Sequence, residues 1–134
     1  MTGEVVATAG GRQYLSFSRF FNGTIYVHTG ETVEWVNLDP TEPHTVTFGT
    51  EPANPQALVG TAPGADGTLL ATINSTSDSV SSGFLQASPE DAAGRAQAAP
   101  GTTRIRITFT HKGTYKYICA LHDVNGMLGT VVVK

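Results

Sequence analysis

Short stretches in which apolar and polar residues alternate recur along the chain, with turn-forming residues between them. The clearest is 104–109, where Ile105, Ile107 and Phe109 alternate with polar residues. Successive side chains of a strand point to opposite faces, so this pattern predicts a strand with one buried face. Less regular alternation predicts further strands at 24–28, 31–37 and 44–48, and 4–8 is a short candidate strand.

The same alternation indicates which side chains face the core. Val33 and Trp35 share one face of 31–37, and His44 shares a face with Val46 and Phe48. No stretch has an apolar stripe with the 3.6-residue period of a helix. Many short strands separated by turns favour an all-β fold, an antiparallel Greek-key sandwich or barrel.

Near the C-terminus, the pattern predicts a strand, a loop and a closing strand. Tyr115, Tyr117 and Cys119 share one face of the first strand, and 131–133 forms the second. The loop between them holds one further histidine and a methionine. We expect its glycines, Gly126 and Gly129, to let the chain turn back tightly.

This segment brings a thiolate, an imidazole and a thioether close together in sequence, as Cys119, His122 and Met127. Sulfur donors suit copper(I), and two histidines, one cysteine and a distant axial methionine form a blue-copper electron-transfer site. Taken singly, each residue also has an ordinary explanation. A lone cysteine often serves as a small buried apolar residue, and a histidine in a glycine-rich loop often belongs only to a turn.

The second histidine of such a site has three candidates. His44 is favoured, because it begins a strand on the core-facing side and follows a proline-bearing loop. His28 lies opposite the apolar face of 24–28, and His111 opens a Lys-Gly turn, so we expect both in solvent. They remain the alternatives.

Composition places the chain among globular proteins. Its 134 residues are 40% hydrophobic and 14% charged, which predicts one domain spanning 1–134. A net charge of −3 without a basic run argues against a nucleic-acid partner, and no apolar run has the ~20 residues that span a bilayer. The first residues do not resemble a signal peptide, so the protein is cytosolic or its signal segment is absent from this sequence.

Residues 50–102 differ from the rest of the chain. They are rich in Ala, Gly, Pro, Ser and Thr and poor in charge. Strands are possible at 69–73 and 80–85, and 89–99 is either one helical turn or an irregular loop. Structureless loops of this length are uncommon inside a domain, so we expect a partly ordered insertion before the penultimate strands.

Two motifs together resemble the small blue copper proteins, the cupredoxins, and most closely the plastocyanin and pseudoazurin group. The first is Trp35-Val-Asn37 followed by Pro43-His44-Thr-Val-Thr-Phe48, and the second runs from Gly113 through Cys119-x2-His122-x4-Met127. The resemblance covers about 24–49 and 103–134. It implies an eight-stranded Greek-key β-sandwich. It also implies one type 1 copper per chain, with His44, Cys119 and His122 equatorial and Met127 axial.

The chain departs from the resembled family at three positions. Plant plastocyanins carry tyrosine where Ile118 stands, so their docking route is in doubt here. Many members have asparagine at the position of Thr45, where it ties the two ligand loops together, and proline at the position of Leu121. We expect the backbone N–H groups of Thr45 and Leu121 to approach the Cys119 sulfur.

The resemblance implies reversible one-electron transfer and no enzymatic activity. Expected partners are larger redox proteins that dock transiently around His122, against an apolar patch of Pro40, Pro43, Leu121, Val124 and Leu128. We expect a monomer in the periplasm or outside the cell. Two other functions stay open. A copper carrier or storage protein would use the same donors, and a non-redox β-sandwich domain would result if the donors did not converge.

Overall fold

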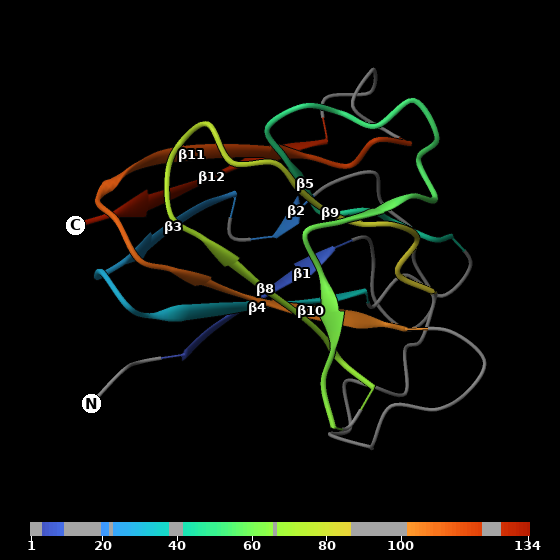
Figure 1. Ribbon diagram of the computed structural model, residues 1–134, viewed down its shortest axis with the longest axis horizontal. Helices are drawn as coiled ribbons and strands as arrows, with labels where there is room; N and C mark the ends of the chain where they lie inside the picture. The colour runs from blue at the N-terminus through green and yellow to red at the C-terminus, as the bar shows by residue number, and fades with distance from the viewer. Residues whose placement is uncertain are drawn as a thin grey trace.

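The computed structural model describes residues 4–9, 20–21, 23–37, 42–65, 67–86, 102–121 and 127–134. Across these residues the chain forms twelve strands in two six-stranded sheets. Figure 1 shows β11 and β12 running along one layer, with β4, β8 and β10 in the other. The expected all-β sandwich is confirmed. No helix in the described ranges is long and apolar enough to cross a membrane.

The first sheet, sheet I, is built around β4 and β10. In spatial order its strands are β2 (Phe20–Phe21), β1 (Glu4–Ala9), β4 (Thr32–Asn37), β10 (Arg104–Phe109), β8 (Leu69–Ile73) and β7 (Ala62–Pro63). The pair β4–β10 is antiparallel, whereas β1 runs parallel to β4 and β8 runs parallel to β10. Sheet I therefore mixes both pairings.

The second sheet, sheet II, carries the C-terminal strands. In spatial order its strands are β3 (Thr24–Val27), β12 (Leu128–Val133), β11 (Gly113–Ile118), β5 (Thr47–Phe48), β9 (Val80–Ser82) and β6 (Leu58–Val59). Neighbouring strands pair antiparallel except β12 with β3. The long hairpin β11–β12 places both ends of the predicted ligand loop at one end of the sandwich.

Most predicted strands agree with the structure. β8 and β10 have the predicted bounds, and β10 alternates buried and half-buried residues as its pattern requires. The strand predicted at 44–48 is shorter, since only Thr47–Phe48 belongs to β5. The backbone N–H of Val46 donates to the Ser82 hydroxyl at 2.9 Å instead of to a backbone carbonyl. The regular ladder is therefore interrupted, and His44 is left in an isolated bridge with Leu85.

Part of the region expected to be an insertion belongs to the sandwich itself. β6 to β9 all lie within residues 50–86, and β8 pairs with β10 inside sheet I. Eight strands were expected. Among the described residues, eight strands have three or more residues, and β2, β5, β6 and β7 have two each. The segment 89–99 lies outside the described residues.

Interlocked aromatic rings fill the core between the sheets. The Trp35 ring lies 5.2 Å from the Tyr117 ring and 5.8 Å from the Phe48 ring, both edge to face. Phe109 and Phe20 extend this cluster, with Phe109 against Phe48 and Phe20 against Tyr117. Edge-to-face contacts of this kind are favourable beyond the area they bury. Tyr117 stands two residues before Cys119, so the cluster gives that segment a tightly packed base.

Candidate metal centre

Cys119 and Met127 meet where β11 ends and β12 begins. The last pair of the hairpin ladder is Ile118 with Leu128, and the backbone N–H of Cys119 donates to the Met127 carbonyl at 3.1 Å. Both side chains are fully buried. Strand pairing alone therefore brings the thiol and the thioether to one end of the sandwich.

His44 reaches the same place from a distant part of the sequence. Its backbone N–H donates to the Leu85 carbonyl at 3.2 Å, and the Leu85 N–H donates back at 2.8 Å. The imidazole is fully buried, and its Nδ1 lies 3.7 Å from the Cys119 Sγ. The sequence-based preference for a core-facing His44 is confirmed, and this side chain meets the cysteine.

The two alternative histidines lie in solvent. The His28 side chain is 79% exposed and its Nδ1 lies 3.1 Å from the Glu31 carboxylate. His111 is exposed beside the Thr110 hydroxyl, with 2.9 Å between Oγ1 and Nδ1. Both predictions of exposure are therefore confirmed, the one for His28 from its strand face and the one for His111 from its turn.

His122, the fourth predicted ligand, lies outside the described residues. In the part of the chain that the structure describes, no three His, Cys, Asp or Glu side chains gather into a metal-binding group. Of the four predicted donors, only His44 and Cys119 are of those types and lie among the described residues, since Met127 contributes a thioether.

Thr45 contacts the cysteine segment through both its backbone and its side chain. Its N–H donates to the Cys119 Sγ at 3.3 Å, which confirms the predicted approach to the sulfur. Its hydroxyl oxygen accepts the backbone N–H of Ala120 at 2.7 Å. Threonine therefore ties the two loops together where many members of the resembled family have asparagine. The contact of the Leu121 N–H with the sulfur stays a prediction. The Leu121 side chain is partly buried and packs against the core.

Asn37 positions the segment before His44, a role that its place in the first motif did not reveal. The side-chain amide donates to the carbonyls of Glu42, at 3.0 Å, and Leu85, at 2.8 Å, and the residue is fully buried. Its backbone N–H donates to the Thr103 carbonyl at 3.0 Å. The signal available in the sequence was a polar side chain at the end of a predicted strand, directly after Trp35 and Val36. Its partners depend on strand register, which the sequence alone does not give.

Gly129 has a different role from the one predicted. It lies inside β12, opposite Tyr117, rather than in a loop. A Cβ at this position would lie 2.2 Å from the Tyr117 Cζ, so the ring occupies the space of a side chain. Burial raises the pKa of the Tyr117 phenol, and the Trp35 indole lowers it by a smaller amount. Tyr117 therefore stays neutral at physiological pH.

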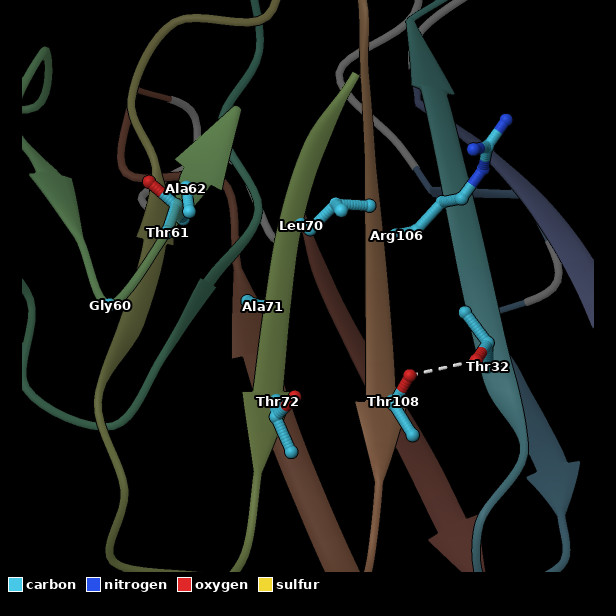
Figure 2. A pocket seen from close by; sticks show the side chains of 9 residues that line it. All are labelled: Thr32, Gly60, Thr61, Ala62, Leu70, Ala71, Thr72, Arg106 and Thr108. Carbon is cyan, nitrogen blue, oxygen red and sulfur yellow. Dashed lines mark hydrogen bonds between the residues drawn. The ribbon is translucent and has the colours of Figure 1, made fainter. Parts of the chain in front are cut away.

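A separate groove lies on the outer face of sheet I. Figure 2 shows it between β8, β10 and β4, with residues 60–62 along one side. Thr32 and Thr108 share a hydrogen bond of 2.8 Å across it, and Arg106 pairs with Glu34 at 2.9 Å. None of its lining residues is His, Cys, Asp, Glu or Met. Its lining therefore offers none of the side chains predicted to bind metal.

The side chains gathered at the end of β11 fit a copper ion. The Cys119 thiol lies beside a buried imidazole nitrogen, and buried Met127 is joined to Cys119 by a backbone hydrogen bond. Sulfur with imidazole is a donor set that suits copper. The family model of copper-binding proteins of the plastocyanin/azurin family matches residues 4–134. The chain belongs to this family. The match also extends over 4–23 and 50–102, which the two sequence motifs did not reach.

Solved cupredoxin structures resemble the fold over nearly its whole length. A mutant fern plastocyanin is 22% identical, with 97% of this chain and 100% of that chain covered and a TM-score of 0.54. The oxidised plastocyanin of Dryopteris crassirhizoma is 21% identical, with 97% and 100% covered and a TM-score of 0.53. A Cu(I) form of an amicyanin mutant is 20% identical, with 100% and 85% covered and a TM-score of 0.55.

Comparison with curated proteins gives no match. Family membership therefore rests on the family model, and the solved structures support the cupredoxin fold. The cofactor that follows from this membership is copper, one ion per chain.

Proposed function

We propose that this cupredoxin is a type 1 copper electron-transfer protein. His44, Cys119 and His122 are the equatorial ligands, Met127 is the axial ligand, and one domain spans 1–134. The observation that carries the proposal is the 3.7 Å separation between His44 Nδ1 and Cys119 Sγ in a fully buried position. A buried imidazole beside a buried thiol, next to a methionine, is the core of a blue-copper site.

The protein holds His44 and Cys119 rigidly and keeps them away from solvent. His44 is fixed by its two backbone bonds to Leu85, and Cys119 is fixed by its N–H bond to the Met127 carbonyl. Bound copper supplies a reversible one-electron change between Cu(II) and Cu(I). Because His44, Cys119 and Met127 are held by backbone hydrogen bonds in a close-packed core, they move little when the charge changes. The Cys119 thiol must lose its proton to bind metal, so loading depends on pH.

Electrons enter and leave through His122, at the loop between β11 and β12. We expect a small apolar surface around it. Of the residues expected there, Leu128 is 56% exposed, and Pro43 and Leu121 are half-buried. Pro40 and Val124, also expected in this patch, lie outside the described residues. Larger redox proteins dock here transiently, since brief electron-transfer encounters need only a small contact. The protein acts as a monomer.

Members of this family carry electrons and are not enzymes, and we assign the same role to this chain. As a carrier between redox proteins it works in the periplasm or outside the cell, where small blue copper proteins are found. The proposed function involves no nucleic-acid partner and no membrane-spanning segment.

Voltammetry tests the proposal. The copper-loaded protein should give a reversible one-electron wave that the metal-free protein lacks. A protein that only carries or stores copper would bind the metal but lose it on reduction or oxidation, and its wave would be irreversible. That result would overturn the electron-transfer function.

A further inference from the structure

Three buried hydroxyl groups form a chain that runs from the cysteine segment to β9. Thr45 Oγ1 lies 2.9 Å from Thr47 Oγ1, which lies 3.0 Å from Ser81 Oγ. All three residues are at most 1% exposed. At the other end, Thr45 Oγ1 accepts the Ala120 N–H at 2.7 Å. Hydrogen bonds thus connect Ala120 with a strand about forty residues away in the sequence.

Strand geometry explains why these three hydroxyls meet. Thr45 and Thr47 are two residues apart in extended chain and project to the same side. Thr47 is directly opposite Ser81 in the β5–β9 ladder. Each hydroxyl lies away from water, where leaving a donor or acceptor unsatisfied is costly. Buried hydroxyls that are joined by hydrogen bonds in this way restrict one another's orientation.

Thr45 is the point at which this network meets the cysteine. Its backbone N–H donates to the Cys119 sulfur, and its hydroxyl accepts the N–H of Ala120, the residue after Cys119. The bond to Thr47 fixes the Thr45 side chain in the orientation that accepts from Ala120. Ser81 in turn fixes Thr47. Hydrogen bonds thus link the backbone next to Cys119 to a serine on another strand.

We propose that Thr47 and Ser81 are positioning residues for Cys119, acting through the hydroxyl of Thr45. This role rests on the proposed function, since the thiolate is the group that sets the properties of a blue-copper site. Neither side chain is a ligand. Their effect is to hold the Cys119–Ala120 backbone in the geometry the metal needs before metal arrives.

Ser82 provides a matched control. It neighbours Ser81 and is equally buried, but its hydroxyl accepts from the Val46 N–H at 2.9 Å and donates to the Gly83 carbonyl at 2.7 Å. It therefore takes part in the same sheet without bonding to Thr45 or Thr47 in the described contacts. Loss of the Ser82 hydroxyl should loosen the strand pairing without reaching Ala120.

Amide hydrogen exchange of the metal-free full chain tests the network without copper. Exchange at Ala120 should be about threefold to tenfold faster in Ser81→Ala and Thr47→Val, the range set by losing one net hydrogen bond. Thr47→Ser, which keeps the hydroxyl, should restore slow exchange, and Ser82→Ala should leave Ala120 unchanged. Equal acceleration in Ser81→Ala and Ser82→Ala would overturn the proposal. If Thr47→Val does not fold, the comparison of Ala120 exchange between Ser81→Ala and Ser82→Ala still tests the proposal.

The copper-loaded variants give a second readout. Ser81→Ala should shift the thiolate-to-copper charge-transfer band and the reduction potential, whereas Ser82→Ala should retain the wild-type values. Unchanged values in Ser81→Ala, with Ala120 exchange also unchanged, would show that Ser81 has no positioning role. Absence of this band in the wild-type protein would instead refute the proposed function. Hydrogen exchange in the metal-free protein would still test the hydroxyl network on its own.

Discussion

The Thr45 backbone N–H points at the Cys119 sulfur across 3.3 Å, although the two residues are 74 positions apart in the sequence. A donor aimed at a thiolate withdraws charge from it. The same threonine holds Ala120 through its hydroxyl, so one residue fixes both the environment of the sulfur and the chain that follows it. The ligand loops are thereby joined before any metal binds.

Replacement of Cys119 by serine should remove the blue colour. A hydroxyl at this position is neither a soft donor nor readily ionised, so the thiolate-to-copper charge-transfer band has no source. Visible absorption of the copper-treated variant measures this. Persistence of the band in Cys119→Ser would mean that another residue supplies the chromophore.

Replacement of His44 by alanine should destroy the site, because this imidazole is buried beside the sulfur. The exposed histidines provide matched controls. His28→Ala and His111→Ala should keep both the copper content and the spectrum of the parent protein. Bleaching by His28→Ala with an intact spectrum in His44→Ala would reverse the assignment.

Replacement of Leu121 by proline should lower the reduction potential. If the Leu121 N–H donates to the Cys119 sulfur, it disfavours Cu(II), which relies more on thiolate donation, and proline removes that donor. A charge-assisted bond contributes about 1.5–3 kcal/mol, and only its difference between the two oxidation states, ~1–2 kcal/mol, changes the potential. At about 59 mV per tenfold for one electron, the fall is roughly 40–90 mV. An unchanged or higher potential with an intact spectrum would show that this N–H points elsewhere.

Replacement of Gly129 by alanine should destabilise the fold. The new Cβ would lie 2.2 Å from the Tyr117 Cζ, so the ring or the strand must move. Overpacking a core commonly costs about 1–3 kcal/mol in the free energy of unfolding, and denaturant titration of the metal-free protein measures this cost. Gly23→Ala is the control, because no atom lies within 4 Å of a Cβ built there. Equal stability of the two variants would mean that Tyr117 does not need the space above Gly129.

Local patterns in the sequence predicted the strands whose alternation is regular. β10 and β8 have the predicted bounds because one face of each is buried and the other is not. β5 was predicted too long, since a side-chain hydroxyl of Ser82 replaces a backbone acceptor at Val46. No local sequence pattern reveals that a side-chain hydroxyl takes the place of a backbone acceptor.

The site could be predicted as far as its residue types and strand faces allowed. The pairing of β11 with β12 follows from the two strands around the loop, and a core-facing His44 follows from its periodicity. The contacts of Asn37, Thr47 and Ser81 could not be foreseen, because they depend on which strands become neighbours. Gly129 was misread because a glycine beside a loop looks the same whether it turns the chain or makes room for a ring.

The most direct test of the central claim is the visible spectrum of the full chain, recorded during titration with Cu(II) and paired with elemental analysis. A His2Cys site with axial Met127 predicts an intense thiolate-to-copper band that grows in proportion to added metal and saturates at one copper per chain. A colourless copper complex, or reproducible binding of two copper ions per chain, would contradict it.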